Sequence, residues 1–183
     1  MNRIRRFAFI VYVVFFLVSG ITVDTLYAID SDLTRQTLTG LKGVSVAVEN
    51  PQSNIRKYAQ RYGLTREQMQ KEIEQKLAGR GVTVLNQDKW SHTPGRPVLY
   101  VNVNTHGYQK YWYSYTINIE LRQIVTLEAN PAVKTLADTW SVDMAGVANI
   151  GTLGTIRENM NMLIDKFIEA WRSANRKGIQ PTE

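Results

Sequence analysis

Residues 98–145 read VLYVNVNTHGYQKYWYSYTINIELRQIVTLEANPAVKTLADTWSVDMA, and this stretch predicts the centre of the fold. Apolar side chains alternate with polar ones along three successive segments, which is the pattern of half-buried β-strands. Gly107 and the pair Asn130-Pro131 separate the segments, and both are turn signals. Short connections favour antiparallel neighbours, so we expect a three-stranded meander. The side chains expected to face the interior are Leu99, Val101, Val103, Thr105, Tyr113, Tyr115, Ile117, Ile119, Leu121, Leu136, Trp140, Val142 and Met144.

The segments on either side of this stretch predict two more strands and three helices. GVSVAVE alternates strictly, and a later helix can begin with a capping box made by Thr65 and Gln68. We expect strands over residues 43–49 and 82–85, helices over 53–62, 65–79 and 155–175, and a loop over 88–97. The order predicts an α+β fold: a two-layer sandwich whose mainly antiparallel sheet has about five strands in the order βααββββα, with the helices on one face.

Composition bounds the class of protein. The chain has 183 residues, of which 44% are hydrophobic and 21% charged, as expected for one globular domain. It contains no Cys, which excludes a disulfide framework, a thiolate metal site, a cysteine nucleophile and a lipidated cysteine. The net charge is +6, and it falls to +4 without residues 1–28, which hold three Arg and one Asp. An excess this small does not by itself indicate a nucleic-acid-binding protein.

Residues 1–28 have the features of a secretory signal peptide. Three arginines precede an apolar run over residues 7–18, and Ala28 precedes a polar stretch. An uncleaved N-terminal membrane anchor is the alternative, because Ala28 lies far from the apolar run. Either way we expect export, to the periplasm or outside the cell. The predicted organisation is a signal peptide over residues 1–28, a spacer or short frayed helix over 29–42, a single α/β domain over 43–175 and a flexible tail over 176–183.

Three local patterns carry a resemblance to known proteins. They are the valine strand VSVAV (44–48), the pattern G-L-T-x-E-x-M…L-x-x-x-G that begins at Gly63, and a long hairpin closed by a helix. In this layout the chain from Gly43 to Asn175 resembles small envelope modules of Gram-negative bacteria, namely the amino-terminal domain of TolB and the periplasmic part of curli-secretion lipoproteins. Such modules bind protein partners or assemble and are not enzymes, so the resemblance implies an interaction role. Several are lipoproteins, whereas this chain has no Cys to lipidate.

The residues that most often carry catalysis or metal binding do not form a motif. His92 and His106 are the only histidines, and they lie in separate segments without metal-ligand spacing, so we expect no metal and no cofactor. Asp138 has apolar neighbours and is a candidate buried acid, but pairing with a Lys or an exposed strand end explains it more simply. GTLGT (151–155) could receive an anion on its backbone N–H groups, but a capped turn is the simpler interpretation.

The run YQKYWYSY (108–115) is the sharpest anomaly in the sequence. It holds five aromatic residues across a hairpin turn, and strand alternation cannot bury all of them. Tyr113 and Tyr115 fit the buried row. The candidates for an exposed binding surface are therefore Tyr108, Lys110, Tyr111 and Trp112. The alternative is that these rings fold around the sheet edge and pack on Trp90 or on a helix.

These observations rank three functions. The first is a non-enzymatic exported envelope domain that binds a protein partner, or itself, through the aromatic hairpin and the nearby sheet edge. The second is a glycan- or cell-wall-binding module that stacks sugars on exposed rings; such rings also suit a membrane headgroup layer. A hydrolase with a dispersed site is weakest, because no nucleophile and base can be paired. Nucleic acid is not an expected partner of an exported protein.

Overall fold

The computed structural model describes residues 30–175, so the predicted signal peptide and flexible tail lie outside the described residues. Within residues 30–175 the fold is α+β, with a four-stranded mixed sheet in the order β1-β2-β3-β4. The strands are β1 (Ser45–Val48), β2 (Val98–Gln109), β3 (Trp112–Leu127) and β4 (Asn130–Asn149). The helices are α2 (Asp32–Gln36), α3 (Arg56–Tyr62), α4 (Arg66–Gly79), α5 (Gln87–His92) and α6 (Gly154–Asn175), with a 3-10 turn η1 (Ile150–Thr152) before α6.

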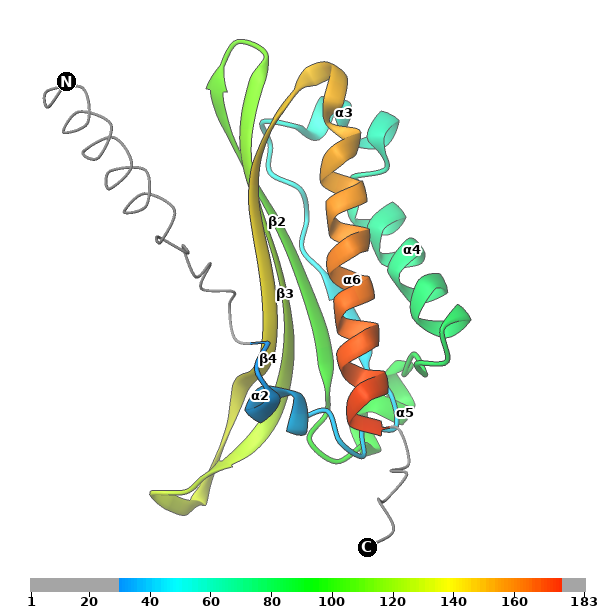
Figure 1. Ribbon diagram of the computed structural model, residues 1–183, viewed down its shortest axis with the longest axis vertical. Coiled ribbons are helices and arrows are strands. Elements are labelled where there is room, and N and C mark those ends of the chain that lie inside the picture. Colours follow the sequence, from blue (N-terminus) through cyan, green and yellow to red (C-terminus); the bar gives the residue numbers. More distant parts are fainter. Residues whose placement is uncertain (1–29, 176–183) are drawn as a thin grey trace, which may run out of the picture.

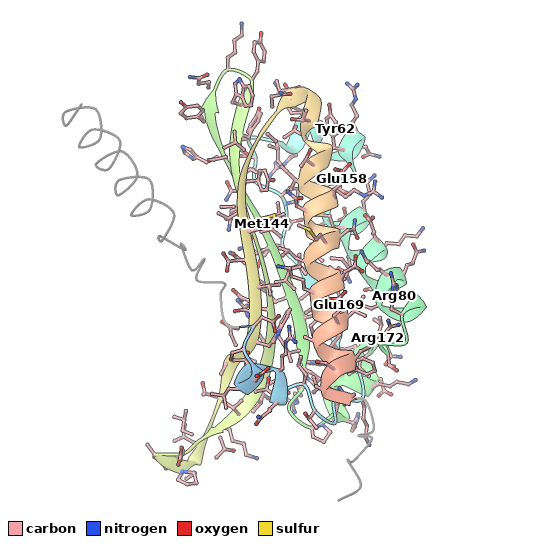
Figure 2. All side chains as sticks on the ribbon, viewed as in Figure 1. Tyr62, Arg80, Met144, Glu158, Glu169 and Arg172 are labelled. Atoms are coloured by element: carbon pink, nitrogen blue, oxygen red, sulfur yellow. The ribbon has the colours of Figure 1, made fainter. Side chains whose placement is uncertain are left out.

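The long helices lie on one face of the sheet. Figure 1 shows α4 and α6 side by side along this face, with α3 at the end that carries the β2–β3 turn and the β3–β4 turn at the opposite end. Along the helix layer, Tyr62 and Glu158 lie toward the end with the β2–β3 turn, whereas Arg80 and Arg172 lie toward the other end (Figure 2). The guanidinium of Arg172 donates to the carbonyl of Arg80 at 2.8 Å, which ties α6 to the end of α4.

The sheet differs from the predicted one in strand number and in one pairing. The strand predicted over residues 82–85 is reduced to a single parallel bridge between Val84 and Val44. β1 pairs in parallel with β2, with Val46 opposite Leu99, and only the β2-β3-β4 meander is antiparallel. The helices between β1 and β2 return the chain to the end where β1 began, and a crossover of this kind makes the next strand parallel.

The predicted interior rows of β2 and β3 are confirmed. From Leu99 to Thr105 and from Tyr113 to Leu121, each alternate side chain expected to face the core is at most 7% exposed. The capping box at the start of α4 is also confirmed, since Thr65 Oγ1 accepts a hydrogen bond from the N–H of Gln68 at 3.2 Å. From the opposite layer, α6 buries Ile156, Met160, Leu163, Ile164, Phe167, Ile168 and Ala170.

A bulge in β4 reverses the orientation predicted for the first half of that strand. Leu121 pairs with Trp140 while Arg122 pairs with Asp138, so Thr139 is an extra residue in β4. Because side chains alternate with a period of two, one extra residue moves the preceding ones to the other face. Trp140 is therefore buried, whereas Leu136 is 58% exposed. The prediction that these two residues share an inward face is wrong for this reason.

The segment predicted as a spacer is packed against the sheet. Leu38 is fully buried. Asp30 accepts a hydrogen bond from the indole N–H of the buried Trp140 at 2.9 Å, and two from the Arg35 guanidinium, both at 2.7 Å. These hydrogen bonds, with that of Arg35 the largest influence, hold the pKa of Asp30 below its ordinary value. The packed body of the protein therefore includes Asp30, well before the predicted boundary at residue 43.

Two local predictions also change. The predicted loop over residues 88–97 contains most of α5, because Asn86 caps a short helix by accepting a hydrogen bond from the N–H of Lys89 at 2.9 Å. The capped turn predicted over residues 151–155 begins earlier: Asn149 and Thr152 form a capping box around η1. Both changes come from an asparagine that caps a turn immediately after an extended segment.

Candidate binding surface

The aromatic hairpin is built from the ends of β2 and β3. Both strands continue past the turn predicted at Gly107, and a two-residue turn of Lys110 and Tyr111 joins them. Gly107 pairs with Tyr113 and Gln109 pairs with Trp112, so Tyr108 is a bulge residue without a partner in the ladder. A bulge bends its strand and redirects its side chain. The hairpin therefore displays Tyr108 at a site where regular alternation would not place it.

The aromatic residues of the hairpin divide into an exposed and a buried group. Tyr108, Tyr111 and Trp112 are 69%, 54% and 43% exposed, whereas Tyr113 and Tyr115 are 7% and 5% exposed. This division answers the question left by alternation alone: the first three rings lie at the surface instead of packing on Trp90 or on a helix. The ammonium group of Lys110 lies 5.2 Å from the ring centroid of Tyr111, within the range of a cation–π contact.

Hydrogen bonds hold the hairpin turn to the helix layer. The N–H of Ile150 donates to the carbonyl of Tyr111 at 3.0 Å, and the hydroxyl of Tyr62 donates to the carbonyl of Ile150 at 2.6 Å. Tyr111, η1 and α3 are thus joined at one end of the molecule. The exposed rings sit on an anchored turn, which lowers the entropy cost of binding through them.

The outer face of the sheet, opposite the helices, is a polar surface that ends at Trp112. Asn102 lies opposite Asn118, Asn104 opposite Thr116, and His106 opposite Ser114. Val147 pairs with Ser114 and is 61% exposed, so it lies diagonally beside Trp112 on the same face. A shallow recess of about 290 Å³ includes Asn104, His106, Ser114, Thr116 and Ala145 in its lining.

Asp138, the candidate buried acid, is an exposed member of an ion-pair cluster on this outer face. Arg122 donates to Asp138 at 3.0 Å and to Glu120 at 2.7 Å, and its guanidinium lies 3.5 Å from the ring centroid of Tyr100. Partial burial opposes the charged guanidinium, but Glu120 and Asp138 outweigh it and raise the pKa of Arg122. The hydroxyl of Tyr100 donates to Glu49 at 2.8 Å. The cluster accounts for Asp138 without a catalytic role.

β4 is the last strand in the sheet order, and its free edge has a protected half and an open half. The first half contains Pro131, Lys134 and the bulge, and the carbonyl of Thr139 accepts a hydrogen bond from Thr37 Oγ1 at 3.2 Å. Prolines, lysines, bulges and covering segments are the usual means by which proteins block an edge strand. Among residues 30–175, the second half, residues 141–147, has none of these and a single charged residue, Asp143.

The alternation of the ladder shows which backbone groups reach the open edge. The N–H of Ile150 is bonded toward β3, so alternate residues before it direct their N–H and C=O groups to β3 as well. The intervening residues direct theirs away from β3, toward the free edge. These residues are Ser141, Asp143, Ala145 and Val147. Val147, the last of them, lies next to Trp112, which pairs with Asn149. Sequence reasoning indicated a nearby edge but did not locate it.

The remaining candidate residues are not brought together. His92 lies on α5, whereas His106 lies on β2 in the outer face. No group of three or more His, Cys, Asp or Glu residues within residues 30–175 could hold a metal ion. In the run over residues 151–155, Asn149 Oδ1 accepts hydrogen bonds from the N–H groups of Gly151 and Thr152, so this turn is capped. None of the helices in the described part of the chain is both long and apolar enough to span a membrane.

A second hollow, which the sequence did not indicate, lies at the opposite end of the sheet. It has a volume of about 680 Å³ and a mostly apolar lining that includes Trp90, Pro94, Val98, Ile124 and Leu136. The indole N–H of Trp90 is buried without a hydrogen-bond partner among the described residues. The hollow exists because the loop before β2 packs beside β3, where the N–H of Ile124 donates to the carbonyl of Gly95 at 2.7 Å.

No family model, no curated protein and no solved structure matches this chain. The resemblance to the TolB and curli-secretion modules therefore stays a prediction from the sequence, and the function has to be argued from the surface itself.

Proposed function

We propose that this protein is a non-enzymatic exported envelope domain that binds a protein partner by strand addition. The partner supplies an extended segment that pairs with residues 141–147 of β4. The end of this segment lies near Trp112. The observation that carries the proposal is the open half of the β4 edge, which lacks the protection that the first half has. A second copy of the chain is the other partner that such an edge accepts.

The physical basis of strand addition is the unpaired backbone of the β4 edge, combined with the nearby ring of Trp112. Each added ladder hydrogen bond contributes on the order of 1 kcal/mol, so the backbone supplies affinity for any extended segment. Val147 and Trp112 supply selectivity, because a partner side chain on the outer face packs on Val147 and a long one reaches over β4 to Trp112. The wider resemblance to envelope modules, and the predicted signal peptide, point to a partner in the same compartment.

Ala145→Pro tests the proposal. The N–H of Ala145 points to the free edge, so a proline there leaves the β3–β4 ladder intact and removes a donor that the partner strand needs. We expect the variant to lose at least about tenfold in affinity for a partner captured from the envelope fraction, with little change in melting temperature. The partner should also slow hydrogen exchange at the amides of Ser141, Asp143 and Val147 in the wild-type protein.

Leu136→Pro is the matched control, because Leu136 is exposed and directs its N–H to the same edge in the protected half. It should keep the captured partner. Equal loss of the partner in both proline variants, or capture that is unchanged by Ala145→Pro, would contradict strand addition. If the captured protein is the chain itself, the edge serves self-association.

A second candidate, binding of a glycan or cell-wall polymer, is favoured by the polar outer face that ends at Trp112. Uncharged amides and hydroxyls beside an exposed ring suit sugar hydroxyls and a sugar face, respectively. Sedimentation with purified peptidoglycan should then retain the wild-type protein and lose Trp112→Ala with Asn104→Ala. Absence of the wild-type protein from the pellet would eliminate this candidate.

A further inference from the structure

The positive charge of the protein is concentrated at the aromatic hairpin end. This end comprises residues 52–67, 106–114 and 147–158, which meet through the hydrogen bonds that join Tyr111, Ile150 and Tyr62. The three segments contain six basic and two acidic residues. The rest of the described chain contains eleven basic and twelve acidic residues. The described part of the protein therefore has one cationic end with a net charge of +4, and is nearly neutral elsewhere.

Five of the six basic side chains at this end are available to a ligand. Arg56, Lys57, Arg61, Arg66 and Lys110 are all exposed. The sixth, Arg157, is ion-paired with Glu72, and the other arginines and lysines in ion pairs among residues 30–175 lie outside this end. Lys57 and Arg61 lie over the rings of Tyr58 and Tyr62, at 4.7 and 5.5 Å from the ring centroids, so aromatic and basic groups alternate on α3 as they do in the hairpin.

From this arrangement we propose that the aromatic hairpin end docks on an anionic phospholipid membrane surface. Tyr108, Tyr111 and Trp112 enter the headgroup layer, where amphipathic rings are favoured over both water and hydrocarbon. The basic residues of α3, the start of α4 and the hairpin turn then face the phosphates, within the distance over which their charge is effective. The proposal shares Trp112 with strand addition, but it does not need the backbone edge of β4, which runs away from this end and stays open.

The shape of the surface favours a membrane over a protein as the ligand of this end. A standard protein interface covers about 800 Å² on each partner around a buried apolar centre. Here the exposed rings belong to a projecting two-residue turn and its flanks (Figure 1), with charged groups between and around them. A fluid headgroup layer closes around such a turn, whereas a folded partner needs a hollow of matching shape. The charge is complementary to lipid phosphates and adds about fivefold in binding for each Lys or Arg.

The test measures the fluorescence of Trp112 in the hairpin, so it applies to the full-length protein whether or not the leader is removed. Full-length protein is mixed with vesicles that contain brominated phosphatidylcholine, with or without about one third phosphatidylglycerol. We expect quenching of tryptophan fluorescence with the anionic vesicles, little with the neutral ones, and loss at about 0.5 M salt. Trp112→Phe should remove the quenchable signal, because the other three tryptophans, Trp90, Trp140 and Trp171, are buried or half-buried.

A charge-matched pair of variants decides the outcome. Lys57→Gln with Arg61→Gln should lower binding to the anionic vesicles about 25-fold. Lys89→Gln with Lys134→Gln removes the same charge from exposed residues at the other end, and should change binding little. Equal effects of the two pairs, equal quenching with neutral vesicles, or quenching that survives Trp112→Phe would overturn the proposal. If the wild type shows no quenching, and Lys57→Gln with Arg61→Gln loses a protein that the wild type captures from the envelope fraction, this end binds an acidic protein instead.

Discussion

Replacing Trp140 with alanine is expected to lower the free energy of unfolding by about 3–5 kcal/mol, as large aromatic-to-alanine changes in cores do. Trp140 is 1% exposed, and its ring meets that of Phe167 edge-to-face, with centroids 5.3 Å apart. The change removes this contact between β4 and α6 and leaves a cavity. It also leaves Asp30 without one of its donors, so the packed N-terminal segment loosens. Urea unfolding followed by circular dichroism measures the loss.

Trp140→Phe separates the two contributions. Phenylalanine keeps an aromatic ring against Phe167 but has no N–H to donate to Asp30. We expect it to cost much less than alanine, on the order of 1 kcal/mol for the lost hydrogen bond with some further loss from the smaller ring. Equal destabilisation by the two variants would contradict this division. It would show that the link to the segment before β1 contributes most of the stability at this site.

Gly146→Val is expected to lower the free energy of unfolding by about 2–3 kcal/mol, in the range of overpacked cores. Gly146 lies opposite Tyr115 in the ladder, and a Cβ at this position would overlap the phenol ring of Tyr115. That ring cannot simply turn away, because its hydroxyl accepts a hydrogen bond from Asn159 of α6 at 2.6 Å and only 5% of the residue is exposed. The melting temperature should fall accordingly, as calorimetry can measure.

Gly107→Val is the matched control, since Gly107 is also a glycine within a strand of this sheet but a Cβ there meets nothing within 4 Å. It should be tolerated, as valine suits a strand. A double variant, Gly146→Val with Tyr115→Leu, should recover part of the loss if the overlap with the ring is its cause. A similar loss of stability in Gly107→Val, or no coupling in the double variant, would assign the effect to the loss of a strand glycine and not to the overlap with Tyr115.

The parts of the fold that follow from local alternation were predictable. The row from Leu99 to Thr105 and the row from Tyr113 to Leu121 are buried as expected, because a period of two in an uninterrupted strand assigns each side chain to a face. The capping box at Thr65 was predictable for a similar reason, since its hydrogen bonds span three residues. The division of the five hairpin aromatics could be predicted only in part: Tyr113 and Tyr115 continue the buried row, but the bulge at Tyr108 has no local signal.

The tertiary structure was needed wherever distant residues decide the outcome. The bulge at Thr139 depends on the register between β3 and β4, and it turns Asp138 from a candidate buried acid into the partner of Arg122. The packing of residues 30–38 depends on Trp140, more than a hundred positions away, so composition alone made this segment look like a spacer.

The amino-acid sequence was sufficient for the class of fold, for the buried rows and for an aromatic run with more rings than a strand can bury. These properties follow from hydrophobic burial and backbone periodicity within single segments. Folding in three dimensions selected the exposed rings, placed them at the same end of the molecule as the basic residues of α3, and left residues 141–147 at an open edge. These features depend on which strands and helices become neighbours. Pairing between distant segments produces no periodic pattern in the amino-acid sequence.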